Sequence, residues 1–253
     1  MQEQLFSEKL SHIKNIIIVL SGKGGVGKST VSCQLALTLA NMKYKVGILD
    51  VDICGPSVPG ILGVSNKEIV QSQDELKCMS IGFLLKNKDD AVIWRGPKKN
   101  SMIKQFIQDV CWKELDFLII DTPPGTSDEH ITLAELLRDF KNINSIIVTT
   151  PQNVSTIDVS REINFCKKLN IPIRGIIENM SGYVCPCCKE ITFIFGSGGG
   201  QKLSNEYNIP FLGSIPIEPE LANAEDNGIN YIKNFSNSVT SMQFTNIVNI
   251  ILN

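Results

Sequence analysis

The sequence predicts an α/β protein: a single doubly wound, mostly parallel sheet with helices on both faces. Short runs rich in Ile and Val alternate along the chain with longer segments whose apolar residues recur at helical spacing. Strands without polar alternation are buried on both faces, as in a parallel sheet that is covered by helices. A glycine-rich stretch, SGKGGVGKST at 21–30, follows the first apolar run, where such folds bind phosphate groups.

Six apolar runs are predicted as strands, and four amphipathic segments are predicted as helices between them. The predicted strands are 15–20, 45–50, 116–121, 145–150, 173–180 and 211–216. The predicted helices are 28–42, 98–110, 128–140 and 155–169. Because the sequence contains no repeat, low-complexity tract or linker, we predict one domain over residues 1–253, with residues 1–13 as an N-terminal extension.

The final segment, 237–253, spaces four apolar residues on one helical face: Phe244, Ile247, Val248 and Ile251. A membrane-surface helix is one interpretation, but the segment has no Lys or Arg to contact anionic lipid. We therefore predict a C-terminal helix that docks against the sheet.

Composition argues against several classes of protein. The 253 residues are 43% hydrophobic and 20% charged, which is typical of a compact globular protein. A net charge of −2 argues against a nucleic-acid partner, and no stretch reaches the roughly 18 apolar residues of a membrane span. The N-terminus has no secretory apolar region, so we expect a cytoplasmic protein whose eight cysteines are thiols or metal ligands rather than disulfides.

The glycine-rich stretch matches two phosphate-binding patterns. Gly22, Gly24 and Gly27 satisfy the dinucleotide pattern G-x-G-x-x-G, for which Asp50 or Asp52 would be the ribose-binding acid. The same stretch satisfies G-x-x-x-x-G-K-[ST], the P-loop that binds nucleoside triphosphates. The Lys-Ser pair favours the P-loop, because a dinucleotide site needs no ammonium group at the start of the helix.

In the P-loop interpretation, Lys28 contacts the β- and γ-phosphates of ATP, and the Ser29 hydroxyl binds Mg²⁺. The glycines let successive backbone N–H groups point at the phosphates, and the following helix adds its positive end. The residues of this loop predicted to bind ATP or ADP are Gly22, Lys23, Gly24, Gly25, Val26, Gly27, Lys28, Ser29 and Thr30.

Two acidic segments, 50–57 and 121–130, follow predicted strands and should lie at the carboxyl edge of the sheet, where such folds bind ligands. We predict that Asp121 holds Mg²⁺ through water and that Asp52 positions the attacking water. The alternative for Asp52 is a helix or turn cap. Asn179 is predicted to contact the adenine edge, although asparagine after a strand also forms turns.

A second lysine, Lys23, lies inside the loop, where an ordinary P-loop does not require one. The motif GKGGVGK resembles the deviant phosphate loop of the class that includes MinD, ParA and the nitrogenase iron protein. This resemblance implies that Lys23 acts in catalysis with Lys28, by reaching across a dimer to the partner's nucleotide. It also implies that ATP drives dimerisation.

Three cysteines, Cys185, Cys187 and Cys188, lie within the loop SGYVCPCCKE at 181–190. A closed zinc site needs four ligands, yet no second pair of cysteines or histidines follows this loop. The residues alone leave a redox dithiol, half of a zinc site and an iron–sulfur ligand pair open. The dispersed cysteines, each predicted to be a small buried hydrophobe, are Cys33, Cys54, Cys78, Cys111 and Cys166.

Over about residues 13–233, the chain resembles the Mrp/ApbC family of nucleotide-binding proteins. The segments that carry the resemblance are SGKGGVGKST, DVDICGPSVPG, WRGPKKN, DTPPGTSDEH, TTPQNVS, ENMSGYVCPCC and LGSIP, in that order. This family comprises P-loop ATPases that carry or scaffold iron–sulfur clusters. No cysteine precedes Cys33, so the chain resembles the short form of the cytosolic branch, which lacks an N-terminal cysteine cluster.

The resemblance implies that Cys185 and Cys188, in a cysteine loop region at 181–195, ligate a [4Fe–4S] cluster. Four thiolates must then come from two chains. Cys187 departs from the family pattern Cys-Pro-x-Cys and is an alternative ligand.

The function that this resemblance implies is a slow, Mg²⁺-dependent ATPase that assembles the cluster and transfers it to apo iron–sulfur proteins. It would work as a homodimer or in a complex with a long-form relative. Two alternatives stay open: a ParA/MinD-like positioning ATPase, and an ATPase with a purely structural zinc site at the dimer interface.

Overall fold

The computed structural model describes residues 10, 12–64, 70–71, 76–84, 94, 96–188 and 190–253. The predicted N-terminal extension therefore lies almost entirely outside the described residues, and so does Arg95 of the segment WRGPKKN.

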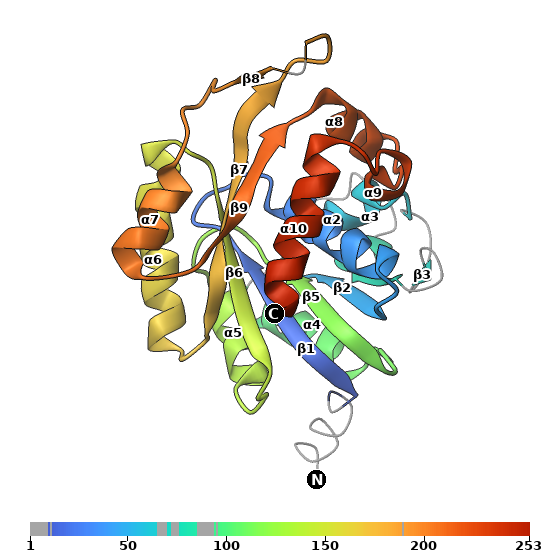
Figure 1. The fold of residues 1–253 in the computed structure, drawn as a ribbon. Coiled ribbons are helices and arrows are strands. Elements are labelled where there is room, and N and C mark those ends of the chain that lie inside the picture. The colour runs from blue at the N-terminus through green and yellow to red at the C-terminus, as the bar shows by residue number, and fades with distance from the viewer. Residues whose placement is uncertain are drawn as a thin grey trace.

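The described residues form a nine-stranded sheet in the order β3-β4-β2-β5-β1-β6-β7-β8, with β9 pairing with β7 (Figure 1). The strands that run parallel are β1 (Ile13–Leu20), β2 (Val46–Asp50), β4 (Leu76–Ser80), β5 (Leu115–Asp121), β6 (Ile143–Thr149), β7 (Ile173–Val184) and β9 (Phe211–Ile217). Two short strands pair antiparallel: β3 (Val70–Gln71) with β4, and β8 (Ile191–Thr192) with β7. The predicted mostly parallel sheet is confirmed.

Strand β4 is missing from the predicted strands. It is only five residues long, and Lys77 and Ser80 interrupt its apolar run, so it carries a weak strand signal. Its place beside β2 extends the sheet on the side of the Asp50 segment.

The four predicted helices between the strands and the predicted C-terminal helix are present with slightly different bounds, and shorter helices accompany them. The helices are α2 (Lys28–Asn41), α3 (Val58–Ile61), α4 (Gly96–Gln108), α5 (Asp128–Leu137), α6 (Asn153–Lys168), α7 (Gly199–Tyr207), α8 (Pro219–Asp226), α9 (Tyr231–Asn234) and α10 (Val239–Leu252), with a 3-10 turn at Ile81–Leu84. Of the helices described, none has the length and apolarity that a membrane crossing requires.

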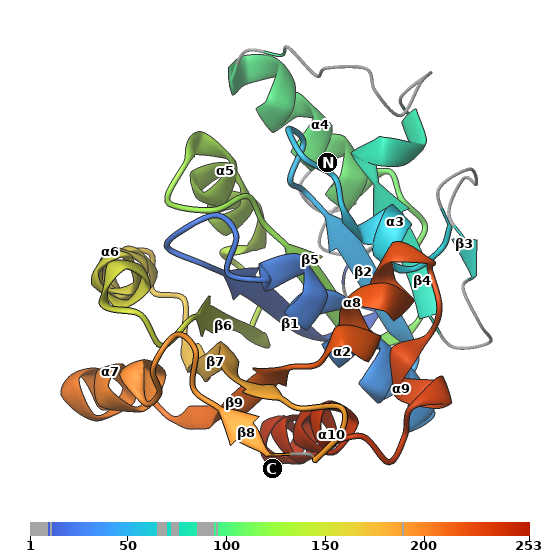
Figure 2. The ribbon, with the colours of Figure 1, turned by 90° about the horizontal axis from the view of Figure 1, so that it is seen from above.

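The helices lie on both faces of the sheet, as Figure 2 shows from above. Successive residues of a strand point to opposite faces. In β1, Ile17 and Val19 pack into the core under α2 and α10, whereas Ile16 and Ile18 pack into the core under α4, α5 and α6. This is why the strands are apolar without alternation: each residue meets a helical layer.

The C-terminal helix α10 packs against β9 and α2. Its buried apolar side chains include Phe244, Ile247, Val248 and Ile251. Arg174, at the start of β7, donates to the carbonyl oxygen of Ile251 at 2.9 Å and so caps the end of this helix.

Strand β7 extends past its neighbours and turns back into β8, which forms a hairpin at the top of Figure 1. The pairing of β7 with β9 shifts between Asn179 and Tyr183, where Met180 and Gly182 have φ angles of 57° and 91°. A Cβ atom on Gly182 would lie 2.5 Å from Ile191 Cγ2, so glycine is required at this bend. The bend lies just before the residues of β7 that pair with β8.

Candidate functional site

The phosphate loop connects β1 to α2 and depends on its glycines. Gly25 and Gly27 have φ angles of 80° and 77°, in the left-handed region that favours glycine. A Cβ atom on Gly22 would lie 2.6 Å from the backbone carbon of Asp158, so the loop approaches α6 too closely for any side chain there. Among the described residues, no side chain caps the start of α2, so its first N–H groups can bind an anion.

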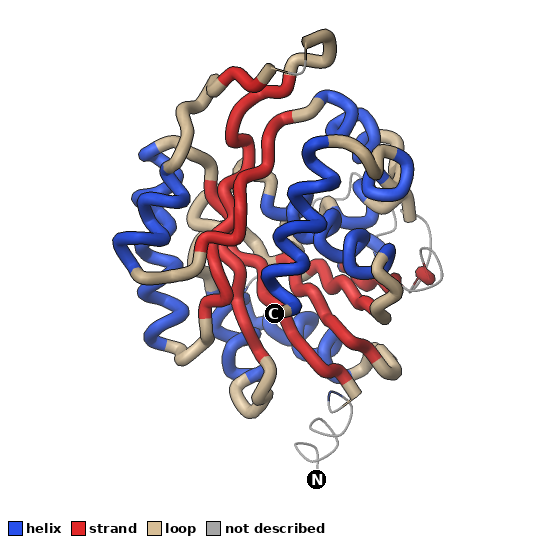
Figure 3. The backbone as a smooth tube through the Cα atoms, in the orientation of Figure 1, coloured by secondary structure: helices blue, strands red, loops and turns tan. Residues whose placement is uncertain are grey.

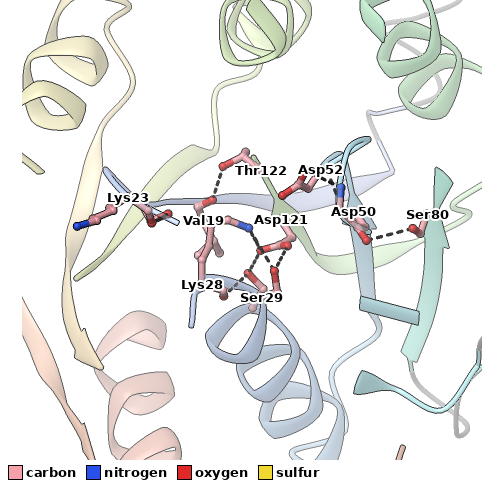
Figure 4. A network of polar contacts seen from close by, with 12 residues as sticks. Val19, Lys23, Lys28, Ser29, Asp50, Asp52, Ser80, Asp121 and Thr122 are labelled. Carbon is pink, nitrogen blue, oxygen red and sulfur yellow. Dashed lines mark hydrogen bonds and ion pairs between the residues drawn. The ribbon is translucent and has the colours of Figure 1, made fainter. Parts of the chain in front are cut away.

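Three polar side chains from the start of α2 converge on Asp121, and Figure 4 labels two of them, Lys28 and Ser29. Lys28 Nζ donates to Asp121 Oδ1 at 2.7 Å, and the Ser29 hydroxyl donates to Asp121 Oδ2 at 2.6 Å. The hydroxyl of Ser32 lies 2.6 Å from Asp121 Oδ1. Asp121 is fully buried and Lys28 nearly so, and each therefore depends on the other for charge compensation.

Ser32 is absent from the predicted site residues. The signal that could have found it is its position one helical turn after Lys28, which places both side chains on the same face of α2. Its contact with Asp121 orients the carboxylate that Ser29 also binds.

These residues fit a nucleoside triphosphate with Mg²⁺. A hydroxyl and a carboxylate that lie 2.6 Å apart are the hard oxygen ligands that Mg²⁺ prefers, directly or through water. A cavity of about 280 Å³ opens above them, lined in part by Lys23, Gly25, Asp52 and Pro124. A larger cavity of about 470 Å³, between the last turns of α5 and α6, contains none of the predicted site residues.

Asp50 and Asp52 have different surroundings at the end of β2. Asp50 is fully buried and accepts hydrogen bonds from the Ser80 hydroxyl and from the backbone N–H of Asp52, both at 3.0 Å. Burial, followed by the nearby charge of Asp121, raises the pKa of Asp50 well above its usual value. Asp52 lines the cavity, and burial raises its pKa to a smaller extent.

A raised pKa makes the Asp52 carboxylate a stronger proton acceptor, as a water-positioning residue requires. The alternative interpretation of Asp52 as a cap also has support, since its Oδ1 accepts from the backbone N–H of Gly55 at 3.2 Å. The two interpretations are compatible, because a carboxylate has a second oxygen.

Asn179 lies against the phosphate loop. Its Nδ2 donates to the carbonyl oxygen of Val26 at 2.9 Å, and its side chain covers Gly27 so closely that a Cβ atom there would collide with it. In this structure Asn179 braces the loop, while its contact with adenine stays a prediction. Lys23 is exposed and points away from the Lys28–Asp121 pair in Figure 4.

The cysteine loop is the tip of the β7–β8 hairpin, drawn as a loop at the top of Figure 3. The backbone N–H of Cys185 donates to the carbonyl oxygen of Glu190 at 2.9 Å and closes the hairpin. The thiols of Cys187 and Cys188 are exposed, and that of Cys185 is half-buried. Cys188 Sγ lies 3.8 Å from Glu190 Oε2.

The sulfur of Cys185 accepts hydrogen bonds from the backbone N–H groups of Cys188 and Cys187, and these bonds lower its pKa. Turn geometry of this kind stabilises a thiolate, the form that binds metal. Within the described part of a single chain, no group of three or more His, Cys, Asp or Glu side chains is arranged to hold a metal ion.

The prediction that every dispersed cysteine is buried is wrong for two of them. Cys33, Cys78 and Cys166 are buried, but Cys54 and Cys111 are exposed. Both exposed thiols lie in connections between elements, where the apolar pattern that identifies core positions is absent.

A parallel sheet with a glycine-rich loop, Lys28 and Ser29 after β1 and an acid at the end of β5 defines a P-loop nucleoside triphosphatase. The model of the NUBPL iron-transfer P-loop NTPase family matches residues 12–252, and the chain belongs to this family. The predicted resemblance is thereby confirmed.

Three similar proteins agree with this membership. The cytosolic Fe-S cluster assembly factor NUBP2 homolog of Trichoplax adhaerens is 52% identical over 98% of each chain. The cytosolic Fe-S cluster assembly factor CFD1 of Saccharomyces cerevisiae is 55% identical over 87% of this chain and 80% of its own. A nucleotide-binding protein of Archaeoglobus fulgidus, solved in complex with ADP, is 38% identical, with a TM-score of 0.76 over 89% of this chain and 91% of its own.

Proposed function

We propose that this chain is an ATP-dependent scaffold that assembles a [4Fe–4S] cluster and transfers it to apo iron–sulfur proteins. The observation that carries the proposal is the cysteine hairpin: Cys185, Cys187 and Cys188 lie together at a tip outside the sheet. An exposed position suits a cluster that is transferred to another protein, because the recipient can reach it, better than it suits a permanently bound cluster. The relatives named cytosolic Fe-S cluster assembly factors support both this function and a cytosolic location.

The cluster would bridge two chains. Iron–sulfur clusters commonly take four thiolates, and Cys185 and Cys188 supply two per chain. Cys187 is the substitute ligand, because adjacent cysteines cannot easily face the same metal centre. The second chain is either another copy or a long-form relative, and we treat residues 1–253 as one domain that carries both the hairpin and the ATPase site.

In a slow, Mg²⁺-dependent ATPase reaction, each of the site residues would have a separate role. Lys28 would exchange its contact with Asp121 for the β- and γ-phosphates. Ser29 and Asp121 would hold Mg²⁺, which supplies charge stabilisation when bound. Asp52 would position the attacking water, and Lys23, exposed at the rim, would reach the nucleotide of the partner chain.

Anaerobic reconstitution with iron and sulfide tests the cluster function. We expect an iron–sulfur absorption band, about four iron and four sulfide per two chains, and a dimer by size-exclusion chromatography with light scattering. Tight zinc binding without iron uptake would favour a structural zinc site. Absence of any metal, together with ATP-dependent co-sedimentation with DNA or anionic vesicles, would favour a positioning ATPase.

A further inference from the structure

Lys99 of α4 joins the two segments that follow β2 and β5, on one side of the phosphate loop. Its ammonium group donates to Glu129 Oε1 at 2.9 Å and to Cys54 Sγ at 3.1 Å. The side chains of Lys99 and Glu129 are only 19% and 10% exposed. Cys54, by contrast, is an exposed thiol. None of these residues belongs to the predicted nucleotide or cluster site.

The two partners of Lys99 belong to the segments that leave β2 and β5. Cys54 follows Asp52 by two residues, in the connection between β2 and α3. Glu129 lies in the first turn of α5, which follows the segment that begins at Asp121. The Lys99 side chain therefore bridges the segment that contains Asp52, the proposed water-positioning acid, and the segment that begins at Asp121, the proposed Mg²⁺ ligand.

The end of this bridge at Glu129 is firmly anchored. The hydrogen bonds that Lys99 donates to Glu129 and then to Cys54 raise the pKa of Lys99 to about 12, so Lys99 stays charged at physiological pH. Although burial acts to raise the pKa of Glu129, hydrogen bonds from Ser127 and Lys99 outweigh it and lower that pKa. Glu129 thus stays ionised, and the pair keeps opposite charges in a poorly solvated position.

The end of the bridge at Cys54 holds the exposed part of the loop that follows β2, Cys54 and Gly55. Val51 is fixed to the sheet, because its backbone N–H donates to the carbonyl oxygen of Asp121 at 2.9 Å. Ile53 is also anchored, because its side chain is buried in the core. Beyond Ile53, the chain is held only locally within the described residues, by the Gly55 N–H, which donates to Asp52 O at 3.3 Å and to Asp52 Oδ1 at 3.2 Å. The contact with Lys99 therefore ties the outer half of this loop to α4 and α5.

We propose that Lys99 is a positioning residue for Asp52, which it holds in place through Cys54. The inference rests on the proposed function, in which Asp52 directs the attacking water. Misplacement of a water-positioning carboxylate slows the chemical step without removing any phosphate contact. Loss of the Lys99 contact should therefore lower kcat about three- to tenfold and leave the Kd for ADP unchanged.

Lys99→Met tests this proposal, with Lys98→Met as the matched control. Methionine keeps the apolar stem and removes the ammonium group. Lys98 is the adjacent lysine, and its ammonium lies 4.2 Å from the centre of the Trp94 ring. Hydrogen–deuterium exchange of residues 51–57 should be faster in Lys99→Met and unchanged in Lys98→Met. Unchanged exchange in both variants would overturn the proposed restraint.

A double-mutant cycle with Cys54→Ala shows whether Lys99 acts through Cys54. If it does, Lys99→Met lowers kcat no further in a Cys54→Ala background, whereas additive losses would contradict the proposal. An unchanged kcat in Lys99→Met would also contradict it. Absence of ATPase activity in the wild-type protein would count against the proposed function, and the exchange measurement would still decide whether Lys99 restrains the loop.

Discussion

The ammonium group of Lys28 lies 2.7 Å from Asp121 Oδ1, in a pair that is almost completely buried. The same carboxylate accepts hydrogen bonds from the hydroxyls of Ser29 and Ser32. A nucleotide must therefore compete with Asp121 for Lys28, and the carboxylate that is released can be compensated by Mg²⁺. We therefore expect nucleotide and Mg²⁺ to bind cooperatively, because Mg²⁺ compensates the Asp121 charge that the nucleotide leaves unpaired when it takes Lys28.

Lys28→Ala should abolish measurable Mg²⁺·ATP binding. Removal of one partner of a buried charge pair typically costs about 2–5 kcal/mol of binding free energy. The free energy of unfolding should also fall by about 3 kcal/mol, because the variant leaves the buried charge of Asp121 without its ammonium partner. Titration calorimetry and thermal unfolding measure the two effects separately, and undiminished ATP affinity would contradict the predicted phosphate contact of Lys28.

Lys23→Ala should spare ADP affinity and impair ATP-driven association or hydrolysis. Lys23 is exposed and points away from the Lys28–Asp121 pair, so its loss leaves the chain's own phosphate contacts in place. Lys104→Ala, at an exposed position of α4, is the control. Analytical ultracentrifugation with ATP measures association, and a variant that dimerises and hydrolyses like wild type would exclude a role across the dimer.

Cys185→Ser and Cys188→Ser should each prevent cluster retention, with folding and nucleotide binding preserved. The hairpin tip lies outside the core, so the loss of a thiol there opens no cavity. Cys187→Ser should retain most of the cluster, because the proposal requires only two ligating thiols per chain and Cys187 is not one of them. Cys111→Ser, another exposed thiol, is the matched control.

Iron and sulfide analysis after anaerobic reconstitution provides the measurement for these cysteine variants. An indispensable Cys187, or a full cluster bound to a monomer, would contradict the bridging arrangement.

Glu162→Gln should stabilise the protein at alkaline pH. Glu162 is buried in α6, and its Oε2 has no hydrogen-bond partner among the described residues. Burial, followed by the charge of Asp158, raises its pKa from 4.5 to about 7. Between these values the folded protein binds the proton more tightly than the unfolded chain, so this contribution to stability falls as the pH rises through that window.

The pKa shift of Glu162 corresponds to about 3 kcal/mol of unfolding free energy. Relative to wild type, Glu162→Gln should therefore be more stable at pH 8 and nearly equal at pH 5. Thermal unfolding at both values provides the measurement, and Glu135→Gln, at an exposed position of α5, is the control. A variant that is equally destabilised at both values would show that Glu162 is held by contacts that do not depend on its charge.

The parts of the site that could be predicted lie close together along the chain. Ten consecutive residues contain the phosphate loop, and its function depends on local backbone geometry and on the first turn of one helix. The three hairpin cysteines are likewise local, since a turn of four residues brings them together. The fold class followed from apolar strands that are buried on both faces.

The remaining contacts join residues that are far apart in sequence. Ser32 lies against Asp121 across 89 positions, and Lys99 reaches Cys54 across 45. Neither contact has a local pattern, because the lateral order of the strands and the packing of α4 against α5 bring these residues together. Strand β4 was missed for a similar reason: its pairing with β2, rather than its own short apolar run, makes it a strand.

The sequence by itself therefore determined the class of fold, the phosphate loop and the thiol pair, whose chemistry depends on neighbours in the chain. Only the tertiary structure decided which groups compensate the buried charge of Lys28, which side chains Lys99 contacts and which cysteines remain exposed. These properties depend on burial and on contacts between separate elements, and both arise only when the sheet has assembled and its helical layers have closed over it.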